Sequence, residues 1–259
     1  MTLRPPFRLT AEHIAIDLPG GRALFTTRHG GVSEGPFASL NLGLTVPAPA
    51  QPHADDPERV ASNRARLAAL VGIPAARFAH ARQVHGSTVT RADGPIDGRW
   101  AAATPGDREA DGQVTTSTGV AAVVLAADCL PVALIAPEAV AMIHAGWRGL
   151  AAGVLAAGVA ALRDAGAQGS IVAAIGPGAG RCCYATGPDV HAVFARHGDG
   201  VREGARLDLK AIAGRELAAA GVTQVHDVGL CTICHQELFF SHRRDGARTG
   251  RQAGVAWRL

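Results

Sequence analysis

Two apolar runs separated by two residues constrain this chain more than any other feature. Residues 132–136 and 139–143 are almost entirely apolar, and Pro137 and Glu138 stand between them. Two short apolar runs around a two-residue break are typical of a tight β-hairpin. Because both runs are continuous, we expect two buried strands joined by a turn at Pro137 and Glu138.

The register of this hairpin predicts that a thiol and an imidazole meet at its open end. A two-residue turn places His144 opposite Pro131. Cys129 lies two residues before Pro131 on the same strand, so it shares a face with His144. Diagonal neighbours of this kind lie about 7–8 Å apart, within reach of a shared ion or substrate. A shift of one residue would place the two side chains on opposite faces.

The composition indicates a globular chain and excludes several classes of partner. A chain of 259 residues, with 47% hydrophobic and 18% charged residues, can bury a sizeable core. The net charge of +3 is too small to imply a nucleic-acid or membrane partner. The N-terminus resembles no signal peptide, and prolines and charges interrupt the apolar region 120–145. We therefore expect a cytoplasmic protein with reduced cysteines.

Apolar spacing predicts the remaining helices and strands. One helix follows Asp56, ends at Gly72 and buries the apolar face Val60, Leu67, Leu70 and Val71. A second runs from residue 147 to 162, with Gly166 as its C-terminal cap. Further helices are expected at residues 188–196 and 207–220, strands at 23–27, 78–90, 120–126, 170–175, 225–230 and 255–259, and loops at 46–57 and 95–107.

The helix that follows His144 suggests where an anion would bind. Its first free amides and the positive end of its dipole favour an anion, and Arg148 adds positive charge. We expect phosphate there. The paired glycines after Arg28 could also hold an anion, although a simple turn is the preferred interpretation of that loop alone. Taken alone, His80 and His85 are each interpreted as structural residues.

Four further cysteines offer chemistry that we consider less favoured. Cys231-Thr-Ile-Cys-His matches a haem-attachment pattern, but attachment requires export. Cys231 and Cys234 could form a structural zinc site with Cys182 and Cys183, although adjacent cysteines chelate less well than a pair with a two-residue spacer. We therefore interpret these residues as buried thiols that behave as small apolar side chains.

Cys129 itself has two functional interpretations. It could bind zinc together with His144 and a further histidine, and three protein ligands with an open fourth position are typical of catalytic zinc. Alternatively, Cys129 could be a nucleophile that His144 activates. The residues alone leave both open.

Eight short motifs follow one another along the chain. They are Thr-Thr-Arg-His-Gly-Gly-Val-Ser from residue 26, Leu-Asn-Leu-Gly from 40, Gln-Val-His-Gly from 83, Ala-Asp-Cys-Leu-Pro-Val from 127, His-Ala-Gly-Trp-Arg-Gly from 144, Ile-Gly-Pro from 175, Cys-Tyr from 183 and Phe-Ser-His-Arg-Arg-Asp from 240. In this order they resemble the laccase-domain family, whose members are named polyphenol oxidase, purine nucleoside phosphorylase or peptidoglycan editing factor. The resemblance extends from about residue 20 to the C-terminus, and the close pairing of Ala-Asp-Cys-Leu-Pro with His-Ala-Gly-Trp-Arg-Gly is highly specific.

The resemblance implies both a fold and a site. The fold is a mixed-sheet α/β sandwich of the cytotoxic necrotizing factor-like cysteine hydrolase type, with residues 1–259 forming one domain. The implied metal ligands and catalytic residues are His85, Cys129 and His144. The implied substrate-binding residues are Arg28, Asn41 and Arg148. Two positions depart from the family pattern: Ala185 stands where members often carry Glu, and His242 where an aromatic residue is common.

The resemblance also implies an activity. It implies a zinc-dependent purine nucleoside phosphorylase, acting on adenosine, inosine and S-methyl-5′-thioadenosine with phosphate, that also deaminates adenosine. We expect a monomer. The alternatives are a cysteine-type amidohydrolase that edits peptidoglycan precursors, a copper polyphenol oxidase and a metal-dependent scaffold. The oxidase is favoured less because laccase copper chemistry needs many paired histidines and the sequence contains no His-x-His.

Overall fold

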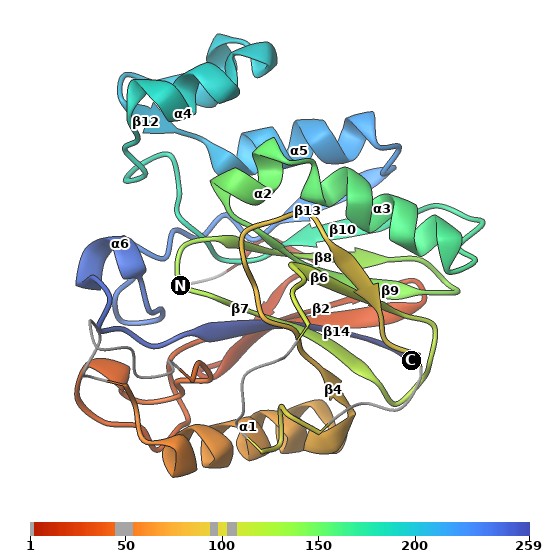
Figure 1. The fold of residues 1–259 in the computed structure, drawn as a ribbon, viewed down its shortest axis with the longest axis vertical. Helices are drawn as coiled ribbons and strands as arrows, with labels where there is room; N and C mark the ends of the chain where they lie inside the picture. The colour runs from red at the N-terminus through yellow and green to blue at the C-terminus, as the bar shows by residue number, and fades with distance from the viewer. Residues whose placement is uncertain (1–2, 45–53, 94–97, 103–107) are drawn as a thin grey trace.

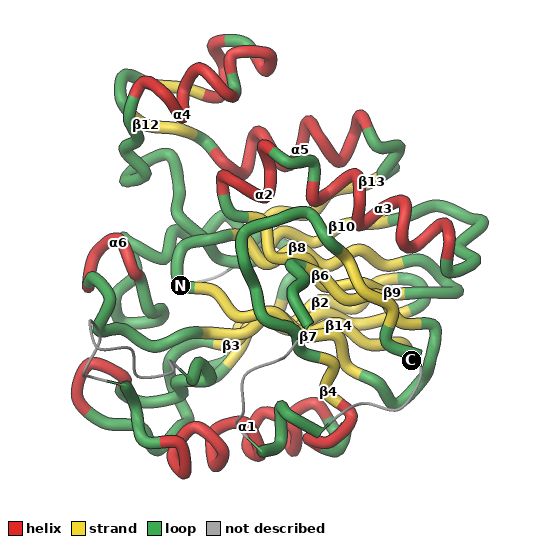
Figure 2. The backbone as a smooth tube through the Cα atoms, in the orientation of Figure 1, coloured by secondary structure: helices red, strands yellow, loops and turns green. Residues whose placement is uncertain are grey.

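The computed structural model describes residues 3–44, 54–93, 98–102 and 108–259 (Figure 1). Two six-stranded sheets face each other in the middle of the molecule, with helices outside them (Figure 2). The α-helices are α1 Pro57–Val71, α2 Trp147–Ala151, α3 Val154–Asp164, α4 Pro188–Val193, α5 Leu209–Ala219 and α6 His242–Asp245. Short 3-10 helices span Gly35–Phe37, Ala75–Arg77, Ala195–His197 and Asp199–Val201.

The first sheet has the strand order β1-β2-β3-β14-β7-β4, and only β4 and β7 pair in parallel. Its strands are β1 Arg8–Leu9, β2 His13–Leu18, β3 Gly21–Thr26, β14 Gln252–Arg258, β7 Ala121–Ala126 and β4 Phe78–Ala79.

The second sheet has the order β13-β10-β8-β9-β6-β5, with parallel pairs at both edges. Its strands are β13 Gln224–Asp227, β10 Val172–Ile175, β8 Leu130–Ile135, β9 Val140–Ala145, β6 Gly112–Thr115 and β5 Val89–Arg91. A separate ribbon pairs β11 Arg202–Glu203 with β12 Arg206–Leu207. The expectation of a mixed-sheet α/β sandwich is confirmed.

Three apolar clusters hold these layers together. The cluster between the sheets joins Ile135 and Met142 of the second sheet to Phe25 of the first. A second cluster packs the other face of β8 and β9 against α3 and α5, and a third packs α1 against the first sheet. Both faces of β8 and β9 are therefore buried, which explains why their sequences are continuously apolar.

The hairpin at the centre of the second sheet has the predicted register. Pro131 pairs with His144, and the amide of Ala136 donates to the carbonyl of Ala139 over 2.9 Å. This register is set by the two-residue turn and by the burial of both strand faces. It brings Cys129 and His144 to the same end of the sheet, as predicted.

Helix α1 matches its predicted boundaries. The carboxylate of Asp56 accepts the amide of Glu58, and Gly72 adopts a left-handed conformation with φ of 76° beyond its last turn. The predicted burial of Leu70 is wrong: Leu70 is 38% exposed, whereas Leu67 is 1% exposed. Of the two predicted loops, residues 46–53, 95–97 and 103–107 lie outside the described residues.

Two predicted elements are broken in the structure. The expected strand over residues 78–90 is reduced to β4 and the start of β5, because the carboxylate of Asp111 takes the amides between them. The expected helix over residues 147–162 is divided between α2 and α3 at Gly153, whose φ is 80°. Since α2 contains only five residues, it lacks the dipole of a long helix, and the anion site predicted on that dipole loses this support.

Candidate metal centre

Cys129 lies just before β8, at a backbone turn that Asp128 holds in place. Asp128 has a φ of 99°, which is rare for a residue other than glycine. Its two carboxylate oxygens accept the Thr232 hydroxyl over 2.7 Å and the Arg243 amide over 2.6 Å. Asp128 therefore caps neighbouring backbone and fixes the chain that presents Cys129.

His144 lies near the end of β9 and is almost completely buried. Its Nδ1 lies 2.8 Å from Oδ1 of Asp111, and its amide donates to the Asp111 carbonyl over 2.7 Å. Burial opposes ionisation of Asp111, but hydrogen bonds from His144 and from the Gly86 and Val84 amides lower its pKa overall. An ionised Asp111 requires a proton on Nδ1 of His144, which leaves the other ring nitrogen for a ligand.

His85 lies in the loop that replaces the predicted strand. Its φ of 62° is in the left-handed region. The amides of Val84, His85 and Gly86 donate to the Asp111 carboxylate over 3.2, 3.0 and 2.6 Å. One buried carboxylate therefore holds the ring of His144 and the backbone that carries His85.

These elements bring three ligand atoms together. The side-chain ligand atoms of His85, Cys129 and His144 all lie within 4.8 Å of one another, and the two imidazole centroids are 4.9 Å apart. Gly146 makes this approach feasible, since a Cβ there would lie 2.8 Å from Sγ of Cys129 and 3.0 Å from Cδ2 of His85. The predicted choice of His85 is consistent with this cluster, whereas His80 packs against Trp100.

The electrostatics favour an ionised pair. Burial raises the pKa of Cys129, but His144 and His85 together lower it to about 6. Burial likewise lowers the pKa of His144, while Cys129 and Asp111 raise it to about 9. One thiolate and two imidazoles are ligands that suit zinc, and a carboxylate behind a histidine ligand is a recurrent support of such sites. The residues present therefore fit a metal ion.

The three predicted substrate-binding residues make contacts within the protein. Arg28 donates to the carbonyls of Ala38 and Gln236 and lies 4.6 Å over the Phe240 ring. Arg148 is exposed and lies 4.5 Å over the Trp147 ring. The substrate roles of both arginines stay predictions.

Asn41 is buried among backbone and side-chain partners. Its Nδ2 donates to Asp55 over 2.8 Å, and its Oδ1 accepts the Arg251 amide over 2.8 Å. Its amide also exchanges hydrogen bonds with the backbone of Gly43. Its contacts thus orient two loops, and its substrate role likewise stays a prediction.

Several residues of the site were not identified from the sequence. Asp111 is the most important, and its signal is the segment Ala-Asp-Gly directly before a strand, which resembles the Ala-Asp-Cys segment before β8. Arg243 stacks 4.7 Å over the Tyr184 ring and donates to the carbonyl of Ala185 over 2.7 Å. Ala185, one of the two positions expected to depart from the family pattern, therefore lies beside a cation.

A family model described as multi-copper polyphenol oxidoreductase laccase matches residues 22–259. The chain belongs to this laccase family. The resemblance predicted from the sequence motifs is thereby confirmed.

Relatives within the laccase family carry a phosphorylase name. A purine nucleoside phosphorylase of Corynebacterium glutamicum is 40% identical, over 91% of this chain and 94% of the relative. Purine nucleoside phosphorylase YlmD of Geobacillus stearothermophilus is 38% identical, over 90% of this chain and 88% of the relative. These names support the expectation that this chain is an enzyme.

Solved structures of the laccase family share the fold. The crystal structure of YlmD from Geobacillus stearothermophilus matches with a TM-score of 0.86 and 35% identity, over 97% of this chain and 98% of that one. YfiH from Bacillus licheniformis matches with a TM-score of 0.86 and 31% identity, over 99% of this chain and all of that one. Within the described ranges, none of the helices is long and apolar enough to span a membrane.

Proposed function

We propose that this chain is a zinc-dependent purine nucleoside phosphorylase that also deaminates adenosine. The observation that carries the proposal is the cluster of His85, Cys129 and His144 around one face of the hairpin end. It occurs in a chain whose relatives are named purine nucleoside phosphorylase. Adenosine, inosine and S-methyl-5′-thioadenosine are the proposed nucleosides, and phosphate is the second substrate.

His85, Cys129 and His144 would hold the zinc ion. When bound with an open position, zinc acts as a Lewis acid and lowers the pKa of a water ligand towards neutrality. Asp111 keeps the proton of His144 on Nδ1 and orients the loop of His85. The same arrangement suits zinc better than laccase copper, because the clusters among the described residues contain two histidines at most.

Phosphate and nucleoside need cationic and polar partners beside this centre, for which we propose Arg28, Asn41 and Arg148. Arg251 is an additional candidate for phosphate. Burial lowers its pKa, and the charges of Cys129 and Asp128 partly oppose this effect. Asn41 accepts the Arg251 amide and would act by positioning it.

We further propose that the chain is a cytoplasmic monomer.

The direct test separates phosphorolysis from hydrolysis. Purified protein is incubated with inosine, with and without inorganic phosphate, and the sugar product is identified by mass spectrometry. We expect ribose 1-phosphate and hypoxanthine only when phosphate is present. Free ribose in equal amounts under both conditions would contradict phosphorolysis. With adenosine, inosine formed without phosphate would report the deaminase activity, and its absence would remove that part of the proposal.

A second candidate is a cysteine-type amidohydrolase acting on peptidoglycan precursors. The observation that favours it is the chain of contacts from Cys129 to His144 and from His144 to Asp111, which has the composition of a cysteine, histidine and acid triad. There His144 would take the thiol proton, and Asp111 would hold the ring. Amidase activity that survives removal of the metal but not alkylation of Cys129 would favour this candidate over the first.

A further inference from the structure

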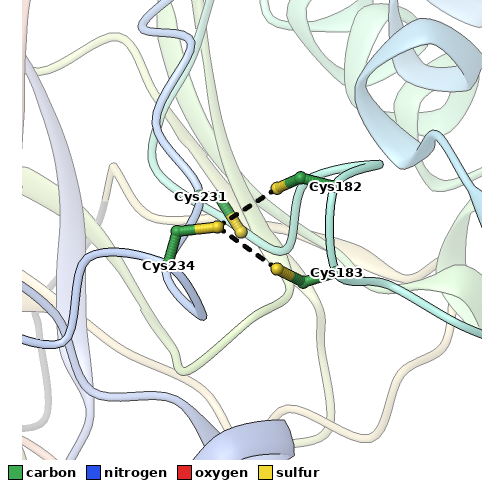
Figure 3. Close-up of side chains that lie close together, drawn as sticks. All are labelled: Cys182, Cys183, Cys231 and Cys234. Atoms are coloured by element: carbon green, nitrogen blue, oxygen red, sulfur yellow. Dashed lines mark hydrogen bonds between the residues drawn. The ribbon is translucent and has the colours of Figure 1, made fainter.

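Four cysteines lie together outside the centre described above. The Sγ atoms of Cys182, Cys183, Cys231 and Cys234 all lie within 4.8 Å of one another. Figure 3 shows their side chains converging from two separate loops. The sequence contains five cysteines, so every one except Cys129 belongs to this cluster.

The sheet topology explains why the two loops meet. Cys182 and Cys183 follow β10, Cys231 and Cys234 follow β13, and these strands pair in parallel. An isolated bridge between Gly178 and Cys231 continues that pairing beyond the strands. Parallel neighbours deliver their following loops to the same edge of a sheet, so the convergence is a consequence of the fold.

The adjacency of Cys182 and Cys183 in the sequence does not prevent both thiols from binding one ion. The amides of Cys183 and Tyr184 both donate to the carbonyl of Gly180 over 3.0 Å, which closes a tight turn. In this turn the Sγ atoms of Cys182 and Cys183 lie 3.3 and 3.2 Å from the same sulfur, that of Cys234. Consecutive residues thus point to one place, as Figure 3 shows.

The second pair has the local structure of a metal-binding turn. Cys231 and Cys234 have the two-residue spacing of zinc ligands. The amide of Gly180 donates to Sγ of Cys231 over 3.2 Å. Cys182 and Cys234 are exposed, so the interpretation of all four as buried apolar thiols is wrong for these two. Hydrophobic packing does not account for exposed thiols that face one another.

The spacing of the sulfurs suits one tetrahedral ion. A zinc ion with Zn–S bonds of about 2.3 Å places its four sulfurs about 3.8 Å apart. The separations of 3.2 and 3.3 Å, and the limit of 4.8 Å for the whole group, bracket this value. Movements of well under 1 Å would therefore accommodate the ion.

The surroundings can balance the charge of such a centre. Four thiolates around Zn²⁺ carry a net charge of about −2. Cations contact the backbone next to the thiols: Arg206 donates to the carbonyl of Cys182, Lys210 to that of Leu230, and Arg244 to those of Thr232 and Ile233. A surface hollow of about 490 Å³, lined in part by Cys182 and Cys231, gives an ion access.

We propose that Cys182, Cys183, Cys231 and Cys234 bind a second, structural zinc ion. All four coordination positions are filled by the protein, which is the pattern of a structural rather than a catalytic site. The ion ties two loops that reach the first centre. Thr232, beside Cys231, donates its hydroxyl to Asp128, and Tyr184, beside Cys183, packs under Arg243. The second zinc thus fixes the loops that contact Asp128, the residue before Cys129.

The experiment uses the Cys129→Ala variant, which removes a ligand of the first centre and leaves the cluster intact. The variant is purified under reducing conditions, and its metal content is measured by inductively coupled plasma mass spectrometry. We expect about one zinc per chain. Replacement by cobalt should give the intense thiolate charge-transfer and red d–d bands of a four-sulfur site. The first centre loses its only sulfur in this variant, so it would give neither band at that strength.

A second variant adds Cys182→Ser to Cys129→Ala. The exposed position of Cys182 makes the change compatible with folding, which circular dichroism verifies. We expect loss of the four-sulfur cobalt spectrum and of most bound zinc. A folded, reduced Cys129→Ala protein without metal or cobalt bands would overturn the proposal. A disulfide between Cys234 and either neighbour that persists under these reducing conditions, without bound metal, would overturn it as well.

Discussion

At the scale of single residues, the first centre depends most on Asp111, because its carboxylate contacts both histidine arms. Asp111→Asn keeps the size of the side chain but removes its charge and half of its acceptor capacity. We expect zinc to bind about 10–100-fold more weakly, measured by competition with a chromophoric chelator. Asp93→Asn is the matched control, since Asp93 also accepts backbone and side-chain hydrogen bonds but supports no ligand. Equal zinc affinity in both variants would contradict the role of Asp111.

Gly146 gives a second test at this scale. In Gly146→Ala the new methyl group would lie 2.8 Å from Sγ of Cys129, so the thiol must move away from the two imidazoles. We expect loss of zinc from the first centre with the fold retained, measured by metal analysis and circular dichroism. Gly214→Ala lies within α5, where nothing approaches the new Cβ, and should retain zinc and gain about 0.5–1 kcal/mol of stability. Full zinc occupancy in Gly146→Ala would be incompatible with the close approach of Gly146 to Cys129.

The pH dependence of Cys129 is the third residue-scale prediction. Its pKa of about 6 lies below the ordinary value of 9.0, so folding favours the thiolate. The resulting stabilisation is fully present above the ordinary value and is lost as the pH falls through about 6. In metal-free protein, we expect the rate of iodoacetamide labelling at Cys129 to fall tenfold for each pH unit below about 6.

Cys182 is the internal control for this titration, read by peptide mapping of the same digest. Partial burial raises its pKa, the Cys234 thiol opposes this effect, and the Cys231 and Cys183 thiols add to it, which brings the pKa to about 11. Its labelling should therefore still be rising well above neutral pH. Labelling of Cys129 that follows the same curve as Cys182 would contradict the proposed thiolate and imidazolium pair.

At the scale of elements, helix α1 tests the layer outside the first sheet. Leu67 is buried against that sheet, whereas Leu70, one turn further on, is 38% exposed. We expect Leu67→Ala to lower the free energy of unfolding by about 2–5 kcal/mol. Leu70→Ala should change it by about 0.5 kcal/mol or less. Urea denaturation measures both, and similar losses in the two variants would contradict the orientation of α1.

The elements also show which parts of the fold were predictable. The register of the β8 and β9 hairpin was predicted to the residue, because a two-residue turn fixes the register and burial of both faces leaves a continuous apolar signal. The strand bounds were not, since β8 begins two residues before the predicted run and β9 ends two residues after it. The loop of His85 was not, because its conformation depends on Asp111, a residue far along the chain. The break at Gly153 was missed because the apolar spacing continues on both sides of it.

At the scale of the whole molecule, the centre is assembled from separate segments of the chain that the second sheet and the loops at its end bring together. His85, Cys129 and His144 come from three loops or strand ends, and Asp111 and Thr232 from two more. Local patterns paired Cys129 with His144, since one hairpin carries both. The family resemblance, rather than spacing, selected His85. A zinc site at the four-cysteine cluster was disfavoured because the sequence does not predict the turn at Gly180 that brings adjacent thiols together.

The central claim is that phosphorolysis depends on a metal held by His85, Cys129 and His144. The most direct test measures ribose 1-phosphate formed from inosine and phosphate by wild-type protein, by Cys129→Ala and by wild-type protein stripped and then reloaded with stepwise amounts of zinc. We predict that the wild-type rate follows occupancy of the first centre, and that Cys129→Ala stays inactive while retaining its other zinc. An undiminished rate from Cys129→Ala, or from wild-type protein shown to hold no metal, would contradict the claim.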